Sequence, residues 1–125
     1  MLTTVKKSSR VMKETNDCAV RAVSIATGRP YRTVHKHFCA NGRKRRKATP
    51  FHVTLNTLND LGFTLRYFKT KAKTVRSLEK DPPPGVYLIR VRNHMLCLRD
   101  GKVHDWTSGR LHRIIFMYKV VDENI

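Results

Sequence analysis

The sequence lacks a long apolar segment and has few cysteines. No stretch approaches the roughly 18 apolar residues of a membrane span, and the basic first 14 residues hold no apolar core of a signal peptide. The 3 cysteines, without a signal peptide, do not indicate a disulfide framework, so we expect at least one free thiol. We therefore expect a soluble protein of the cytoplasm that does not act at a membrane.

Acidic residues are also scarce. Only 9 Asp and Glu accompany 26 Lys and Arg, which gives a formal net charge of +17 at pH 7 and a sequence pI near 10.6. A strongly positive protein surface attracts polyanions. The candidate partners are therefore an acidic protein or peptide substrate and nucleic acid. Charge by itself indicates neither a fold nor an activity, and no feature of the chain indicates an oligomeric state.

The order of the elements can be predicted from hydrophobic spacing. Residues 1–14 are predicted to be a basic flexible arm or a weakly paired edge strand, and residues 15–125 a single domain. Apolar residues recur at helical spacing in the first half of the sequence and at alternate positions in the second half. This pattern predicts helices followed by an antiparallel sheet, which is an α+β fold. Helices are expected at residues 15–28, 30–40, 50–61 and 74–80, and strands at residues 63–68, 86–91, 94–99, 102–106 and 113–121.

The dipeptide Asp100-Gly101 predicts a tight hairpin between two alternating runs. A two-residue turn there pairs residues whose numbers sum to 201. In that register His94 opposes Thr107 and Asp105 opposes Leu96. His94 and Asp105 would then be diagonal neighbours on one face of the sheet, close enough for a hydrogen bond.

Cys18 begins the first predicted helix of the domain, in the stretch TNDCAVRAVSIATG. Backbone N–H groups and the dipole at a helix N-terminus favour a thiolate and lower the pKa of the thiol. A buried, inert cysteine is the alternative. A cysteine, a histidine and an acid in the order Cys18, His94, Asp105 match the requirements of covalent catalysis, in which the histidine activates the thiol and the acid orients the histidine.

The segments NDCAVRA, opening a helix, and NHMLCLRDGKVHDW, on a hairpin, resemble the papain-like cysteine protease superfamily. The layout over about residues 14 to 107 is most similar to compact peptidase domains that process bacteriocin leaders and to small phage-encoded relatives. The resemblance implies a papain-like α+β domain with N-terminal helices packed on a C-terminal antiparallel sheet, located in the host cytoplasm if phage-encoded. It also implies a cofactor-free hydrolase of amide, isopeptide or thioester bonds.

Carried over by position, the resemblance makes Cys18 the nucleophile, His94 the general base and acid, and Asp105 the residue that orients His94. Papain-like enzymes usually hold the oxyanion with a glutamine upstream of the cysteine, and this chain contains no glutamine. We expect Asn16, together with the backbone N–H of Cys18, to donate to the oxyanion in place of that glutamine. A catalytically inactive papain-like domain that serves as a binding module is the alternative within the same fold.

A second reading of residues 19–40 is a helix-turn-helix that binds duplex DNA. Gly28 lies in the turn, and the second helix would present Arg32, Thr33 and Lys36 outward. An ordinary pair of packed helices produces the same pattern.

Two further groups of residues resemble binding sites. His35, His37, Cys39 and His52 suggest zinc, but His37 points away from the face that His35 and Cys39 share, so no metal is expected. The run GRKRRK is expected to be a solvated loop that could bind nucleic acid or an acidic partner. Its charged residues are Arg43, Lys44, Arg45, Arg46 and Lys47.

Overall fold

The computed structural model describes residues 2–105 and 112–123. Within them, helices occupy the first half and strands the second, as the hydrophobic spacing predicts. The helices are α1 (Leu2–Val11), α2 (Cys18–Thr27), α3 (Tyr31–Ala40), α4 (Phe51–Asp60) and α5 (Val75–Lys80). The strands are β1 (Phe63–Tyr67), β2 (Val86–Val91), β3 (His94–Arg99), β4 (Lys102–His104) and β5 (Phe116–Asp122).

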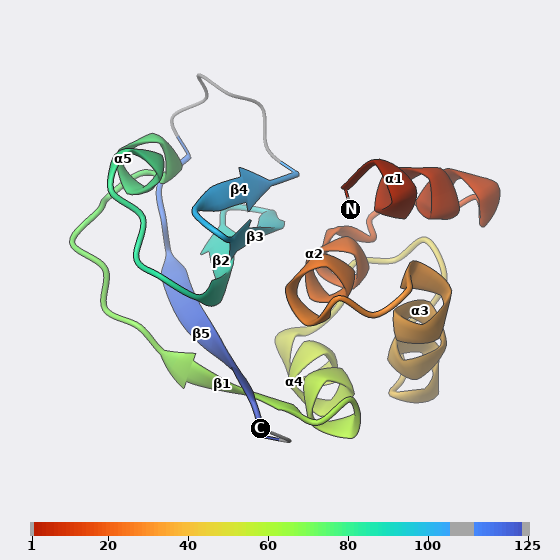
Figure 1. Cartoon of the computed structure of the whole chain (residues 1–125). Coiled ribbons are helices and arrows are strands. Elements are labelled where there is room, and N and C mark those ends of the chain that lie inside the picture. Colours follow the sequence, from red (N-terminus) through yellow and green to blue (C-terminus); the bar gives the residue numbers. More distant parts are fainter. Residues whose placement is uncertain (1, 106–111, 124–125) are drawn as a thin grey trace.

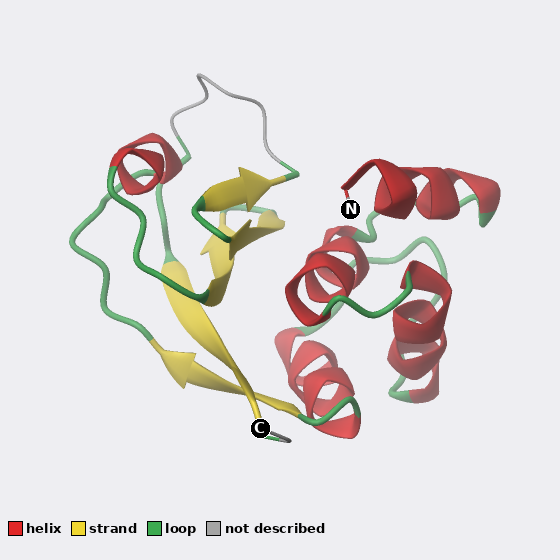
Figure 2. Ribbon diagram, viewed as in Figure 1, coloured by secondary structure: helices red, strands yellow, loops and turns green. Residues whose placement is uncertain are grey.

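The described strands form one antiparallel sheet in the order β1-β5-β2-β3-β4. Helices α1–α4 lie on one face of the sheet and α5 lies on the other (Figure 1 and Figure 2). Alternation along β3 explains the two layers of core: Cys97 packs among the helices, whereas Leu96 and Leu98 pack toward α5. The α+β prediction is confirmed.

Helix α2 is the central helix of the fold. Its apolar residues Val20, Val23 and Ile25 are fully buried between the sheet and the other helices. It ends at Gly28, whose φ of 71° is left-handed and whose N–H donates to the Ser24 carbonyl at 3.0 Å. Buried on almost all sides, α2 fixes the position of its first residue, Cys18, relative to β3. None of the helices in the described residues is long and apolar enough to cross a membrane.

The first 14 residues differ from the prediction of a flexible arm, because residues 2–11 form α1. Val5 enters the helical core, and the Ser9 hydroxyl donates to the Asp17 carboxylate at 2.6 Å. Local spacing missed this helix because LTTVKKSSRV is rich in Thr, Val and Ser, which have modest helix propensity. Tertiary contacts decide its conformation instead.

The hairpin register is confirmed over three pairs: Cys97 with His104, Leu98 with Val103, and Arg99 with Lys102. The strand then ends earlier than predicted. Asp105 has a φ of 68°, which takes it out of the extended conformation, so the expected pairing of Leu96 with Asp105 does not form. The expected partner of His94, residue 107, lies outside the described residues.

Candidate functional site

Cys18 is the first residue of α2 and is half-buried. The residue before it, Asp17, makes no side-chain cap to the helix. The buried Asp17 carboxylate instead accepts hydrogen bonds from the hydroxyls of Ser9 and Tyr31, both at 2.6 Å. The N–H groups of the first turn of α2 therefore keep the positive potential of an uncapped helix N-terminus beside the thiol.

The Cys18 thiol and the imidazole of His94, the first residue of β3, shift each other's pKa. Burial alone would raise the pKa of the Cys18 thiol. The interaction with His94, the Met95 backbone N–H, and the positive charges of His94 and Arg21 outweigh burial and lower that pKa. The interaction with Cys18 raises the pKa of His94 against the opposing effect of burial. Both shifts favour a thiolate paired with an imidazolium.

The other side of the His94 ring faces Asp105. Nε2 of His94 donates to the backbone carbonyl of Asp105 at 3.0 Å, and the carboxylate Oδ2 lies 3.7 Å from the same nitrogen. Because Nε2 carries the donated hydrogen, Nδ1 is the nitrogen left for the thiol. The structure thus brings Cys18, His94 and Asp105 together, but the main hydrogen bond from His94 goes to the backbone of Asp105 rather than to its carboxylate.

Arg21 is a member of this site that the motif reading missed. Its Nη1 donates to Oδ1 of Asp105 at 2.9 Å, and its Nε lies 3.4 Å from Oδ1 of Asp17. Burial raises the pKa of Asp105, while the charges of Arg21, His94 and Lys6 act to lower it. Oδ2 of Asp105 is buried without a hydrogen-bond partner among the described residues. The i,i+4 spacing of Asp17 and Arg21 was the available sequence signal.

Asn16 does not take the position expected of an oxyanion donor. Its side chain is exposed, its backbone has a φ of 53°, and its amide donates to the Arg46 carbonyl at 3.1 Å. The amide thus connects the start of α2 to the basic loop at residues 42–47. Backbone N–H groups at the start of α2 are left as the donors that the site offers to an oxyanion.

A second thiol and imidazole, on α3, form a chain with a carboxylate from the segment between α1 and α2; we call it the Cys39 chain. Sγ of Cys39 lies 3.8 Å from Nδ1 of His35, and Nε2 of His35 hydrogen-bonds to the carboxylate of Glu14. The guanidinium of Arg43 donates two hydrogen bonds to that carboxylate, at 2.9 and 3.2 Å. His35 and Cys39 thus share a helix face as the zinc reading assumed. The described residues hold no group of three or more ligands for a metal ion.

The basic loop is exposed, as its charge predicts, at every residue from 42 to 47 except Arg43. Arg43 is buried against Glu14, and the Arg46 backbone N–H donates to the same carboxylate at 2.9 Å. The side chains of Arg45 and Arg46 donate to the carbonyls of Met12 and Lys13, just beyond α1. Three of the five predicted binding residues therefore make hydrogen bonds that dock the loop on the chain, and four of the five, Lys44, Arg45, Arg46 and Lys47, are exposed. Carbonyls left over at the end of a helix are suitable acceptors for such arginines.

The predicted pair of helices at residues 19–40 is present as α2 and α3. Val34 and Phe38 are fully buried, and Arg32, Thr33 and Lys36 are exposed, as the pattern indicates. The hypothesis that this pair binds duplex DNA stays a prediction.

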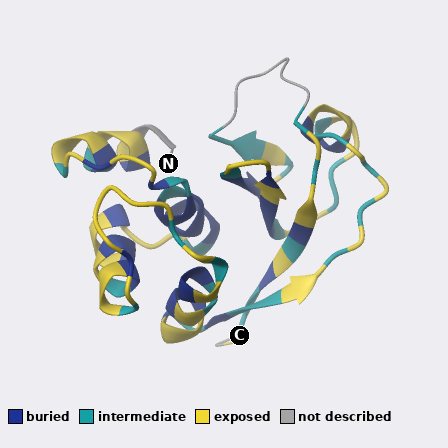
Figure 3. Ribbon diagram, turned by 180° about the vertical axis from the view of Figure 1, so that it is seen from behind, coloured by how far each residue is buried: buried dark blue, intermediate teal, exposed yellow. Residues whose placement is uncertain are grey.

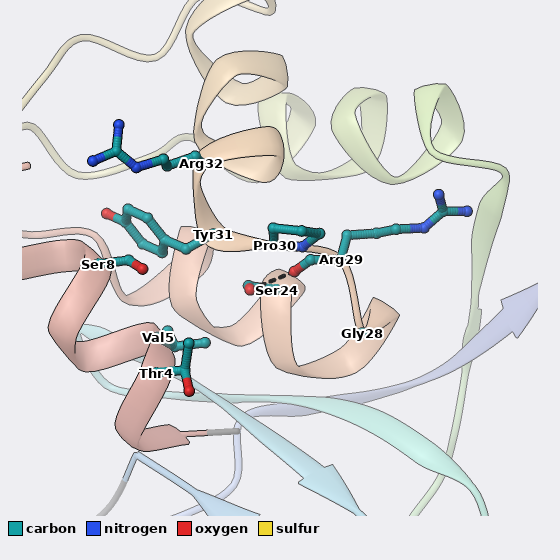
Figure 4. Close-up of a pocket in the computed structure, with 9 residues that line it drawn as sticks. All are labelled: Thr4, Val5, Ser8, Ser24, Gly28, Arg29, Pro30, Tyr31 and Arg32. Atoms are coloured by element: carbon teal, nitrogen blue, oxygen red, sulfur yellow. Dashed lines mark hydrogen bonds between the residues drawn. The ribbon is translucent and has the colours of Figure 1, made fainter.

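A cavity of about 290 Å³ lies where α1 meets the turn between α2 and α3 (Figure 4). Val5, Ser24, Gly28 and Tyr31 are among its lining residues. Ser24 and Gly28 are at the C-terminal end of α2, whereas Cys18 begins that helix. The cavity is therefore separate from the thiol site.

Comparison with family models, curated protein sequences and solved structures gave no match.

Proposed function

We propose that the protein is a papain-like cysteine hydrolase acting on an amide, isopeptide or thioester carbonyl. The observation that carries this proposal is the Cys18 thiol at the N-terminus of α2, whose pKa is lowered by His94, with His94 itself held by the carbonyl of Asp105. Shifts of this kind, from a specific partner at a half-buried thiol, are typical of nucleophilic cysteines. The site calls for no cofactor, and the net charge of +17 favours an acidic protein or peptide as substrate.

In the proposed mechanism, the Cys18 proton moves to Nδ1 of His94 and the thiolate attacks the carbonyl carbon of the substrate. Backbone N–H groups in the first turn of α2 stabilise the tetrahedral oxyanion. His94 then returns the proton to the leaving amine or thiol, and an acyl thioester on Cys18 remains. Water, deprotonated by His94, hydrolyses that thioester, and the Cys18 thiolate leaves. Asp105 and Arg21 hold the His94 ring and do not exchange protons.

The distinguishing test is the reactivity of the three thiols at pH 6. Iodoacetamide should alkylate Cys18 at least about tenfold faster than Cys39, because a lowered pKa maintains thiolate at that pH. Cys39 is an internal control, since it is exposed and also lies beside an imidazole. Peptide mass mapping over time measures both rates. The variant His94→Ala should abolish the advantage of Cys18, whereas equal rates in the unmodified protein would contradict the proposal.

Turnover separates a hydrolase from a binding module with the same site. A peptide thioester is a suitable substrate because it requires little recognition. The protein should hydrolyse it, and Cys18→Ser should abolish that hydrolysis. Selective alkylation of Cys18 without such turnover would indicate the inactive papain-like module. Sequence-selective binding of duplex DNA that is lost on changing Arg32 and Lys36 would favour the helix-turn-helix reading instead.

A further inference from the structure

Four aromatic rings lie together at the end of the sheet formed by β1 and β5. Tyr118 is central, with its ring centroid 5.2 Å from that of Phe51 and 6.2 Å from those of Tyr67 and Phe116. The centroids of Tyr67 and Phe116 are 6.5 Å apart. We call Phe51, Tyr67, Phe116 and Tyr118 the aromatic platform. Tyr67 is 65% exposed and Phe116 is 42% exposed, so the platform is open to solvent.

The strand register explains why these rings share one face. Tyr67 opposes Tyr118 across β1 and β5, and Phe116 opposes Arg90 across β5 and β2. Opposed residues of an antiparallel pair point to the same side. The same face is covered by helices farther along the sheet, where Leu65 and Val120 join the core, and the exposed end of β1 is visible beyond α4 (Figure 3).

Cations border the platform on two sides. The guanidinium of the exposed Arg90 lies 5.6 Å from the Phe51 centroid. On the other side, Tyr67 and Phe116 line a groove of about 450 Å³ together with Lys69, Lys73 and Arg113. No Asp or Glu is among the described residues that line this groove. The groove therefore presents positive charge directly beside two exposed rings.

We propose that the aromatic platform and its groove bind single-stranded nucleic acid. Every base has a π-face that stacks on an aromatic ring, and phosphates are neutralised by lysine and arginine, so exposed rings beside a cationic groove match both parts of an unpaired strand. A duplex keeps its bases stacked on one another and offers none to the rings. An acidic peptide would satisfy the cations but would leave the exposed faces of Tyr67 and Phe116 without an aromatic partner. This binding site is independent of the proposed hydrolase activity.

The test is fluorescence anisotropy with fluorescein-labelled dT15 and U15 at 50 mM and 200 mM salt. The double variant Tyr67→Ala/Phe116→Ala should weaken binding by about 25-fold or more, because each of the two stacked bases contributes roughly fivefold or more to the affinity. Lys69→Ala/Lys73→Ala should reduce the steepness of log affinity against log salt by about 1.4, which reflects two lost phosphate contacts on a single strand. The matched control Arg32→Ala/Lys36→Ala removes equal charge from α3 and should have little effect.

Four results would overturn the proposal. Three are no binding at 50 mM salt, binding that the aromatic double variant leaves unchanged, and a loss of affinity confined to the α3 control. The fourth is a preference for a 15-bp duplex over the single strands. Far-UV circular dichroism serves as the fold check for the platform variants, and alkylation of Cys18 is measured beside it. A failure of the hydrolase proposal would therefore be visible separately.

Discussion

Two chains of thiol, imidazole and acid occur in this protein, and they have similar connections but different surroundings. In the Cys39 chain, His35 lies between Cys39 and Glu14. In the Cys18 site, His94 lies between the thiol and Asp105. In both, Nε2 of the histidine faces the acidic residue and an arginine contacts the carboxylate, Arg43 in one case and Arg21 in the other.

The surroundings separate a structural chain from a reactive one. Cys18 begins a helix whose first N–H groups are uncapped, whereas Cys39 is next to the last residue of α3, at the negative end of the helix dipole. The Glu14 carboxylate accepts hydrogen bonds from Arg43, His35 and the Arg46 N–H. In contrast, Oδ2 of Asp105 has no hydrogen-bond partner among the described residues. The comparison indicates that Glu14 joins α1, α3 and the basic loop, and that Asp105 is left available to an imidazolium.

The largest expected effect is on stability, from the variant Glu14→Gln. The side chains of Glu14 and Arg43 are both fully buried, so removing the carboxylate leaves a buried guanidinium without its counter-charge. Breaking a buried pair in this way costs about 3–5 kcal/mol. Urea unfolding monitored by circular dichroism measures the change. As a control, Glu79→Gln on α5, where the half-buried carboxylate makes no ion pair within the described residues, should change the unfolding free energy by less than about 0.5 kcal/mol.

The same pair predicts a loss of stability in acid. Burial would raise the pKa of Glu14, but hydrogen bonds from Arg43, His35 and the Arg46 N–H lower it to about 2, from an ordinary 4.5. A carboxyl with a lowered pKa in the folded state stabilises the fold above its ordinary pKa, and that contribution is lost as the pH falls from 4.5 toward 2. The contribution is about 3 kcal/mol at 1.36 kcal/mol per pKa unit.

Unfolding free energies between pH 6 and pH 2.5 would measure this contribution. The Glu14→Gln variant should lack it, so the difference between the two proteins should shrink as the pH falls. An equally steep acid dependence in both proteins would show that other carboxylates are responsible.

What could be predicted from the sequence depended on whether local signals decide the conformation. Gly28 ends α2 and Asp100-Gly101 sets the hairpin register because turn chemistry is local. The buried position of Arg43 was missed because it depends on Glu14, 29 positions earlier, and α1 was missed because it depends on tertiary contacts of Val5 and Ser9. The proximity of His94 and Asp105 was anticipated from a pairing that does not form, since the backbone turns at Asp105 and still leaves it beside the ring.

The smallest expected effect comes from Asp105→Asn, and it tests whether the acid acts through its charge. Burial raises the pKa of Asp105, so its surroundings disfavour the charged form and the amide should cost the fold less than about 1 kcal/mol. The backbone carbonyl of residue 105 still accepts from Nε2, so the tautomer of His94 is kept. At His94, the variant loses only the stabilisation of the imidazolium by the carboxylate charge. If that stabilisation is worth one pKa unit, the population of the thiolate–imidazolium pair falls roughly tenfold. Alkylation of Cys18 at pH 6 should therefore slow by up to about tenfold, while the rate at pH 9 stays close to that of the unmodified protein.

His104→Ala is the matched control for that experiment, because His104 precedes Asp105 on the hairpin and opposes Cys97 rather than His94. It should leave the reactivity of Cys18 unchanged at both pH values. If Asp105→Asn instead unfolds the protein, or leaves the rate at pH 6 unaltered, the carboxylate serves Arg21 alone and the Cys18 site works as a cysteine–histidine pair. If the alkylation rate of Cys18 falls at pH 6 but not at pH 9, and the stability is unchanged, the Asp105 charge must act on His94. That result would distinguish Asp105 from Glu14, because the loss of the Glu14 carboxylate lowers the stability of the fold.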